Sequence, residues 1–150
     1  MRTILRKVGK RQGFTLIEVL IVIVVVATLA VIVIPRVMGA SRRGKEATLR
    51  ANLKQLRDAI ERFEANCAAW PPALTDLLAA NGAAISADAD GRGISVDRSA
   101  YEGPYIVSPD GNLPKDTFTG AADWNYDQST GEVHSSSTLT AMDGAAYSSW

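Results

Sequence analysis

A long apolar run near the start of the chain dominates its hydropathy pattern. From Phe14 to Ile34 almost every residue is aliphatic, and these 21 residues are enough to cross the hydrocarbon core of a bilayer as a helix. Basic residues precede the run, as in a secretory signal peptide, but the apolar core of such a peptide is only about 7–15 residues long and ends at a small-x-small cleavage site. No such site follows Ile34. The pattern therefore predicts a retained transmembrane helix within residues 14–36.

Beyond this run, the apolar residues fall on one helical face. They are spaced by 4, 3, 4, 3 and 4 positions, at Leu49, Leu53, Leu56, Ile60, Phe63 and Cys67. Residues 37–66 are therefore predicted to continue the first helix as its amphipathic half. We expect a kink at Pro35, because proline lacks the N–H of a helical hydrogen bond. The apolar face needs a cover, and residues 67–150 are the candidate for it.

Residues 67–150 predict a small head that contains both helix and strand. Two prolines after Trp70 end the long helix, and "PPALTDLLAANG" predicts a short helix that stops at Asn81-Gly82. Residues 83–100 are small and polar and predict a loop. "YEGPYIV" (101–107) predicts a short strand, and "DWNYDQSTGEVHS" (123–135) predicts a hairpin. The expected fold class is α+β, with a long N-terminal helix packed against a small antiparallel sheet.

Charge is distributed unevenly along a chain that is formally neutral. Residues 1–13 hold five basic and no acidic residues, residues 14–64 hold eight basic and five acidic, and residues 65–150 hold three basic and eleven acidic. Basic residues flank both ends of the apolar run, so the positive-inside rule leaves its orientation open. Lys and Arg alternate with acids around the amphipathic half, which is typical of a solvated helix face. We therefore predict no nucleic-acid partner.

Few residues are suited to catalysis or metal binding. Cys67 is the single cysteine, which excludes a disulfide within the chain, and we interpret it as a buried apolar residue. His134 is the single histidine, and no Ser/His/Asp, Cys/His or paired-carboxylate arrangement stands out. "DADGRG" resembles the start of a calcium loop through Asp88 and Asp90, but Arg92 occupies the next ligand position. The sequence therefore predicts no enzyme.

One ionisable residue, Glu18, lies inside the apolar run. A carboxylate at the centre of a bilayer costs about 2.5–3.5 kcal/mol on insertion scales. One explanation is that Glu18 complements the positive N-terminal end of its own helix dipole. A second explanation comes from a family resemblance.

The segment "KRQGFTLIEVLIVIVVVATLAVIVIP" resembles the N-terminus of type IV pilins and of type II secretion pseudopilins. The resemblance rests on the basic leader, the Gly13-Phe14 junction, Glu18, the apolar run and Pro35. A second resemblance, to the major (G-type) pseudopilin, runs through "WPPALTDLL", "GPYI", "LPKDTFTG", "WNY" and "TGEV". Trp70 and Thr117 depart from that pattern, where a tyrosine and a proline are usual.

The resemblance implies a processing step and an assembly step. A prepilin peptidase would remove residues 1–13 by cutting between Gly13 and Phe14 on the cytoplasmic side, and would N-methylate Phe14. The head would then lie in the periplasm, and the chain would cross the inner membrane once. Glu18 would pair with the terminal amine of Phe14 in a neighbouring subunit. Such pairing offsets the cost of the charge and favours one axial register between helices.

The implied function is that of a structural subunit of a type II secretion pseudopilus. Its partners would be copies of itself, other pseudopilins, the prepilin peptidase and the inner-membrane assembly platform of the secretion system. The alternative is a type IV pilus or competence pilin. Larger pilins usually close their C-terminal region with a disulfide, which the single Cys67 does not allow.

The same resemblance raises the question of calcium, which G-type pseudopilins hold near their C-terminus. Calcium takes about six to eight oxygen ligands, but Asp143 is the only carboxylate between Ser135 and Trp150. We therefore predict no metal and no other cofactor. The side chains expected to hold the C-terminal residues by packing instead are Leu139, Met142, Tyr147 and Trp150. A weak calcium site is the alternative, and it would recruit Asp123, Asp127 or Asp143.

Overall fold

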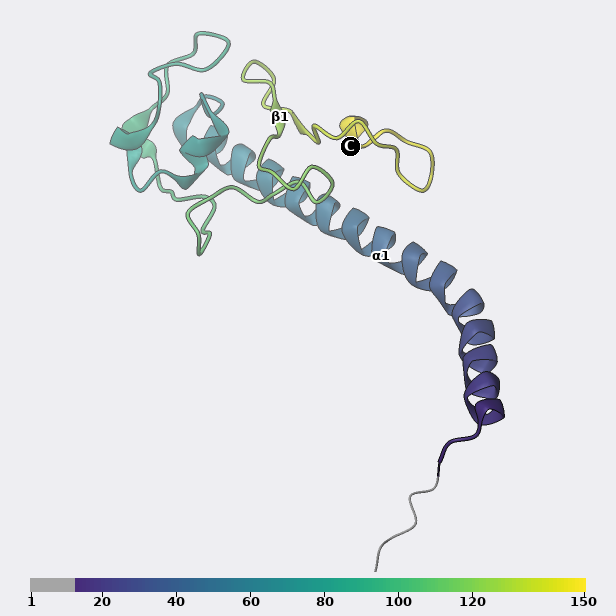
Figure 1. The fold of residues 1–150 in the computed structure, drawn as a ribbon. Helices are drawn as coiled ribbons and strands as arrows, with labels where there is room; N and C mark the ends of the chain where they lie inside the picture. The colour runs from purple at the N-terminus through teal and green to yellow at the C-terminus, as the bar shows by residue number, and fades with distance from the viewer. Residues whose placement is uncertain (1–12) are drawn as a thin grey trace, which may run out of the picture. The chain divides into compact units, whose positions relative to one another are not determined.

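The computed structural model describes residues 13–150, and for residues 34–38 it describes the backbone but not the side chains. Its main element is one α-helix, α1 (Leu16–Cys67), of 52 residues, which a head of short elements follows (Figure 1). The chain divides into two compact units, which we call the anchor unit (up to Ala40) and the head unit (Ser41–Trp150). The predicted leader lies outside the described residues except for Gly13.

The predicted apolar face of α1 is the buried face of the head unit. Leu49, Leu53, Leu56, Ile60, Phe63 and Cys67 are all between 0% and 2% exposed. A fully buried aliphatic side chain of this size contributes about 1.5–3 kcal/mol. The head covers these residues with Leu77, Ile85, Val96, Ile106, Leu113, Trp124, Val133, Ala141 and Tyr147. The prediction of an amphipathic half is confirmed, and every buried hydrophobic residue of the described chain lies in the head unit.

The helix ends where the sequence predicts, but a left-handed residue ends it, which the sequence did not indicate. Ala68, directly after α1, has a φ of 60°, and its N–H donates to the carbonyl of Glu64 at 2.9 Å. A left-handed residue after the last turn is a common way to end a helix, although glycine usually occupies it. Two prolines at 71 and 72 then exclude any continuation.

The sheet of the head is a single antiparallel hairpin. Strand β1 (Asn125–Tyr126) pairs with β2 (Val133–His134), and Tyr126 lies opposite Val133. The turn between them contains Gly131 at a φ of 74°, and a Cβ there would lie 2.6 Å from the Trp70 ring. Glycine is therefore required both by the backbone and by the close approach of the indole. The hairpin predicted within residues 123–135 and the α+β fold class are confirmed.

The remaining regular elements of the head are short 3₁₀ helices. They are η1 (Leu74–Leu78), η2 (Gly82–Ala84), η3 (Arg98–Ala100) and η4 (Tyr147–Ser149). The helix predicted after Pro72 therefore exists as a 3₁₀ helix. The strand predicted over residues 101–107 is wrong. The amides of Tyr105 and Ile106 both donate to the carbonyl of Leu77, at 2.9 and 3.0 Å, so this segment bonds to η1 instead of to a neighbouring strand.

Polar side chains also fasten the head to α1. Asn52 Nδ2 donates to the carbonyl of Lys115 at 2.9 Å, and Thr117 Oγ1 donates to the carbonyl of Lys45 at 3.0 Å. Arg57 Nη2 donates to the carbonyl of Val133 at 2.9 Å. In Figure 1 the segments that follow β1 lie along the C-terminal half of α1. The C-terminal half of α1 thus contributes one face of the hydrophobic core, and it also holds the head by hydrogen bonds to and from the backbone.

Candidate functional site

The N-terminal end of α1 carries Glu18 as part of a helix cap. Glu18 Oε2 accepts hydrogen bonds from the amide and from the hydroxyl of Thr15, both at 2.9 Å. The Glu18 amide in turn donates to Thr15 Oγ1 at 3.3 Å. This reciprocal arrangement is a capping box, which satisfies amides that the first turn of a helix leaves unpaired. The structure therefore supports the first interpretation of Glu18, as a partner of its own helix end.

The cap also leaves part of the carboxylate available. Both bonds from Thr15 end on Oε2, and within residues 13–150 Oε1 accepts no hydrogen bond. Phe14 beside it is 82% exposed. Capping and a second interaction of Glu18 are therefore compatible, because they use different oxygens. Sequence reasoning missed the capping box, although Thr-x-x-Glu directly before an apolar run is its usual signature.

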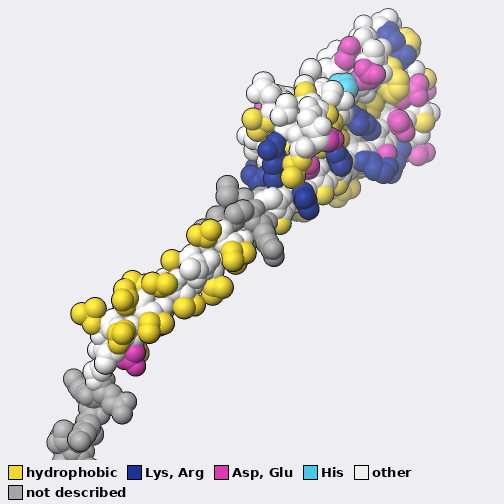
Figure 2. All heavy atoms as spheres, turned by 90° about the vertical axis from the view of Figure 1, so that its right-hand side faces the viewer, with side chains coloured by type: hydrophobic (Ala, Val, Ile, Leu, Met, Phe, Trp, Pro, Cys, Tyr) yellow, Lys and Arg dark blue, Asp and Glu magenta, His cyan; other side chains and the backbone are white. Residues whose placement is uncertain are grey.

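The helix that follows the cap has the length and composition of a membrane span. Residues Leu16–Val33 have a mean hydropathy of 3.2, and none of this segment is buried within the protein. Figure 2 shows hydrophobic side chains over the visible face of this part of the helix. A helix that is apolar on all faces needs an apolar surrounding, from lipid or from other helices.

The helix assignment of α1 runs without a break through Pro35. The side chain of Pro35 lies among those that are not described, so the predicted kink stays a prediction.

The acidic loop that superficially resembles a calcium site is occupied by arginine. The carboxylate of Asp90 is fully buried and accepts from Arg92 Nη2 at 2.6 Å, and Asp88 pairs with Arg98 at 2.8 Å. Burial alone would raise the pKa of Asp90, but the hydrogen bonds from Arg92 and from the amides of Ile94, Arg92 and Trp70 outweigh it and hold the pKa below its usual range. Asp90 therefore serves the fold of this loop, and Asp88 forms an ion pair at its surface.

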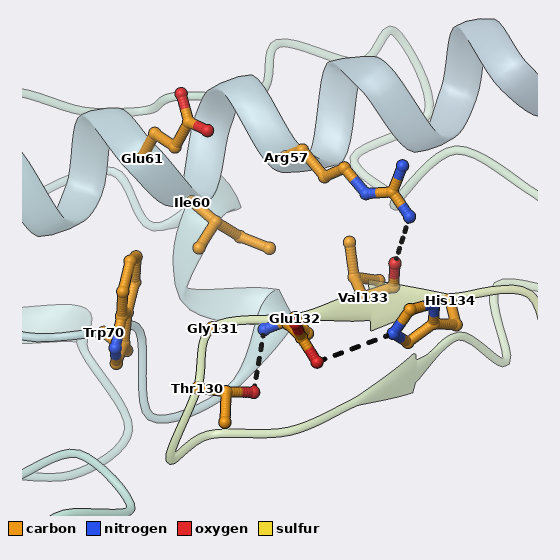
Figure 3. A pocket seen from close by; sticks show the side chains of 9 residues that line it. All are labelled: Arg57, Ile60, Glu61, Trp70, Thr130, Gly131, Glu132, Val133 and His134. Atoms are coloured by element: carbon orange, nitrogen blue, oxygen red, sulfur yellow. Dashed lines mark hydrogen bonds and ion pairs between the residues drawn. The ribbon is translucent and has the colours of Figure 1, made fainter. Parts of the chain in front are cut away.

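A shallow pocket lies between α1 and the β1–β2 hairpin, and it contains the single histidine (Figure 3). His134 Nε2 is 3.8 Å from a carboxylate oxygen of Glu132, and Nδ1 is 3.2 Å from the carbonyl of Trp150. Trp70 and Ile60 form the apolar part of its wall. The hydroxyl of Thr130 also lines the pocket, and its Oγ1 accepts from the amide of Glu132 at 3.3 Å, within the turn of the hairpin.

Cys67 behaves as predicted from its place on the apolar face. It is fully buried and free. Burial raises the pKa of its thiol, which keeps it protonated and unreactive. The interpretation of Cys67 as a buried apolar residue is confirmed.

The C-terminal loop is held by two side chains of α1. Glu46 Oε1 accepts from the amide of Met142 at 2.9 Å and from the hydroxyl of Tyr147 at 2.8 Å, and Arg42 donates to the carbonyl of Thr140. Tyr147 is fully buried and stacks on Phe118 with ring centroids 4.2 Å apart. Sequence reasoning missed Arg42 and Glu46. They continue the 3–4 spacing of the apolar face toward the N-terminus, because Glu46 lies three positions before Leu49 and Arg42 four positions before Glu46.

Two of the four side chains expected to hold this loop do so. Tyr147 is buried, and Trp150 packs edge-on against it with centroids 4.9 Å apart. Leu139 and Met142 are 53% and 49% exposed, so the prediction is wrong for them. Arg42 and Glu46 bond to the backbone of this part of the loop. The loop is therefore held without burial of the Leu139 and Met142 side chains.

The same contacts do not suit a calcium ion. Arg42, a cation, already donates to the Thr140 carbonyl, and the one carboxylate of the loop, Asp143, accepts from the amide of Ala145 at 3.0 Å and lies 3.9 Å from Arg50. Asp123 accepts from Thr119 Oγ1 and Asp127 from Ser129, each in its own local turn. Among the described residues no group of three or more His, Cys, Asp or Glu side chains could hold a metal ion.

Comparison with known proteins places the N-terminal segment in a defined class. Residues 9–34 match the prokaryotic N-terminal methylation motif. The chain is also similar to type II secretion system core protein G. It is 31% identical to that of Pseudomonas aeruginosa over 62 residues, which are 41% of this chain and 44% of the relative. It is 32% identical to that of Xanthomonas campestris over 72 residues, or 48% and 50% of the two chains.

These matches confirm the predicted resemblance of the N-terminal segment to this class and of the chain to the G-type pseudopilin. The chain spans half or less of the length of the curated relatives it matches, and the core protein G of Escherichia coli, 30% identical over 60 residues, is covered to 41%. No solved structure matches the chain.

Proposed function

We propose that this protein is a structural subunit of a periplasmic pseudopilus in a type II secretion system. The observation that carries the proposal is the methylation motif over residues 9–34, which contains the Gly13-Phe14 junction and Glu18. The similarity to type II secretion system core protein G supports it. The role is structural and not enzymatic, in keeping with a head that is built around its own helix.

In this proposal Gly13 and Phe14 form the processing site, and Pro35 is the point at which the helix bends. A prepilin peptidase cuts after Gly13, on the cytoplasmic side of the inner membrane, and N-methylates Phe14. The head stays in the periplasm, and Pro35 allows the helix to bend between anchor and head. The new amine of Phe14 is cationic near neutral pH, since an α-amino group has a pKa of about 7.7–8.0.

Assembly then depends on Glu18 and Phe14 of neighbouring subunits. A carboxylate that is paired with an ammonium group in an apolar surrounding avoids most of the cost of an isolated charge. The free oxygen of Glu18 is suited to this pairing, because the capping bonds occupy the other oxygen. The partners of the filament are further copies of the chain, other pseudopilins and the inner-membrane assembly platform.

A type IV pilus or competence pilin is the second candidate, because the methylation motif is compatible with either kind of filament. The two differ in place. A pseudopilin at its native level stays in the periplasm, whereas a pilin is recovered in the fraction sheared from the cell surface. The buried, unpaired Cys67 favours the pseudopilin.

Mass spectrometry of the protein from membranes tests the processing step. We expect a mature chain that begins with methylated Phe14. Gly13→Val should leave the precursor uncut, because the peptidase has to accept a residue without a side chain before the cut. Gly9→Val is the matched control, since it makes the same change four residues earlier in the leader and should be processed. An unmethylated or uncut wild-type N-terminus would overturn the proposal.

A further inference from the structure

The C-terminal loop, residues 139–147, is fixed to the first turns of α1 in the head unit. The bonds from Arg42 to the Thr140 carbonyl and from the Met142 amide to Glu46 hold its first half. An isolated bridge between Thr140 and Ala146 closes the loop on itself. Because both of its halves are tied, the loop presents its outward side chains in a defined place beside residues 42–46.

Two of these outward side chains are large and apolar. Within the described part of the head unit, four large hydrophobic residues are exposed: Ile94, Val107, Leu139 and Met142. Leu139 and Met142 lie three positions apart on this one loop, and they are 53% and 49% exposed. Single exposed apolar residues are common on protein surfaces, but a pair on a fixed loop provides a small apolar contact.

The two segments that form this surface are basic in sum. Residues 41–50 and 139–147 together contain four basic side chains and two acidic ones. The acidic groups are engaged, since Glu46 is 8% exposed and bonded to Tyr147, and Asp143 lies 3.9 Å from Arg50. Two of the basic groups are engaged with this loop as well, Arg50 with Asp143 and Arg42 with the Thr140 carbonyl. Arg43 and Lys45 are exposed. Figure 2 shows Lys and Arg side chains gathered beside hydrophobic ones at one end of the head.

In the sequence, the basic residues of this surface follow the span closely. Eight residues separate Val33, the end of the span, from Arg42. Clusters of Lys and Arg beside a span are attracted to anionic lipid headgroups, and their long side chains can reach lipid phosphates.

We propose that Leu139 and Met142, with Arg42, Arg43 and Lys45, form a contact surface for the headgroups of a bilayer that contains anionic lipid. The surface docks the head on the membrane around its own anchor before the subunit enters a filament. Basic side chains supply attraction to anionic lipid, and the two apolar side chains insert at the interface. The proposal rests on the proposed membrane anchoring and is independent of the secretion system.

Site-specific quenching in vesicles tests the contact with the full chain. Leu139→Cys carries an environment-sensitive fluorophore, and Cys67 does not compete for the label because it is fully buried. The vesicles consist of phosphatidylcholine with or without phosphatidylglycerol, and they contain a lipid with a spin label either on its headgroup, to report contact at 139 and 107, or deep on its acyl chain, to report insertion at 24. Val107→Cys, at an 81% exposed position, is the matched control in the head, and Val24→Cys reports insertion of the span.

We expect the label at 139 to be quenched at least twofold more than the label at 107 when phosphatidylglycerol is present. Salt, or Arg43→Gln combined with Lys45→Gln, should reduce the difference. Equal quenching at 139 and 107 with a quenched label at 24 overturns the contact alone. An unquenched label at 24 overturns the anchoring and the contact with it. A signal at 139 that follows protein density instead of lipid composition also overturns the contact, in favour of a second copy of the chain.

Discussion

Ala68 is the residue at which the fold is most clearly strained. Its φ of 60° lies in the left-handed region, which costs an L-residue about 1–2 kcal/mol. Glycine avoids this cost but loses more entropy on folding, so we expect Ala68→Gly to stabilise the head unit by about 0.5–1 kcal/mol. Thermal melts of residues 41–150, which contain the whole buried core, measure the change.

Ala51→Gly is the matched control for this prediction. Ala51 is exposed in the middle of α1, where glycine costs about 1 kcal/mol relative to alanine. The same substitution should therefore raise the melting temperature at one position and lower it at the other. A loss of stability at both positions would contradict a left-handed Ala68.

The lowered pKa of Asp90 predicts how the stability of the head changes at acid pH. The folded protein holds the pKa of this carboxyl below its ordinary value, so its contribution is complete above about pH 4 and is lost as the pH falls through the folded pKa. Asp90→Asn should cost about 1–3 kcal/mol at pH 7, because charged hydrogen bonds from Arg92 are lost. The difference from wild type should narrow below about pH 4.

Asp88→Asn is the control, since this carboxylate is 94% exposed and its pair with Arg98 is a surface ion pair, worth about 0–1 kcal/mol. Denaturant unfolding of residues 41–150 at several pH values measures both variants. A penalty for Asp90→Asn that stays constant down to acid pH would show that the charge of Asp90 contributes nothing.

At this scale the sequence predicts burial well for apolar residues and poorly for carboxylates. Cys67 follows from its place on a helical period. Asp76, Asp90 and Asp116 are buried as well, and no pattern in the sequence indicates it. Amides and hydroxyls of nearby turns bond to Asp76 and Asp116, such as Ser86 for Asp76 and Phe118 for Asp116, and amides with the Arg92 guanidinium bond to Asp90. Such bonds depend on loop conformations that have no periodicity.

At the scale of elements, α1 and the β1–β2 hairpin could be predicted because each has a repeating or local signal. The helix has its 3–4 spacing, and the hairpin has alternating residues around a turn that requires glycine. The segment 101–107 has the composition of a strand, but Tyr105 and Ile106 bond to Leu77 of η1. That preference is tertiary, and composition does not contain it.

The C-terminal loop provides the prediction that belongs to this scale. Glu46→Ala leaves the Tyr147 hydroxyl and the Met142 amide without their acceptor, so it should cost about 1–3 kcal/mol. Glu61→Ala, at an exposed position on the same helix, should stay within about 0.5 kcal/mol of wild type. Thermal melts of residues 41–150 compare the two variants.

Calcium and a chelator complete that experiment. Because side chains of α1 hold the loop, neither addition should shift the melting temperature of wild type. A drop of several degrees with the chelator would reveal a metal site and would contradict the assignment of Arg42 and Glu46 as the groups that replace it.

At the scale of the whole molecule, physical patterns in the sequence and a family resemblance give different parts of the prediction. The span and the head follow from hydropathy alone. The processing site at Gly13-Phe14 has no such physical signal, because a peptidase recognises it, and only the resemblance of residues 9–34 to the methylation motif suggests it. Glu18 depends on both, since physical chemistry explains it as a helix cap and the family resemblance explains its charge in an apolar run.

Glu18→Gln separates these two roles. A glutamine at this position can accept the same bonds from Thr15, so the cap is retained, whereas the charge is lost. If Glu18 pairs with the amine of Phe14 in a neighbour, the variant should enter the membrane at least as well as wild type and fail to form filaments on its own. A loss of about 1.4 kcal/mol per contact already weakens association tenfold.

Thr15→Ala makes the opposite change, because it removes the hydroxyl of the cap and keeps the charge. We expect it to assemble. Filaments from cells that express each variant alone, counted by electron microscopy beside a membrane-fraction immunoblot, distinguish the outcomes. Normal filaments from Glu18→Gln together with none from Thr15→Ala would show that the cap, and not the charge, is what assembly requires of Glu18.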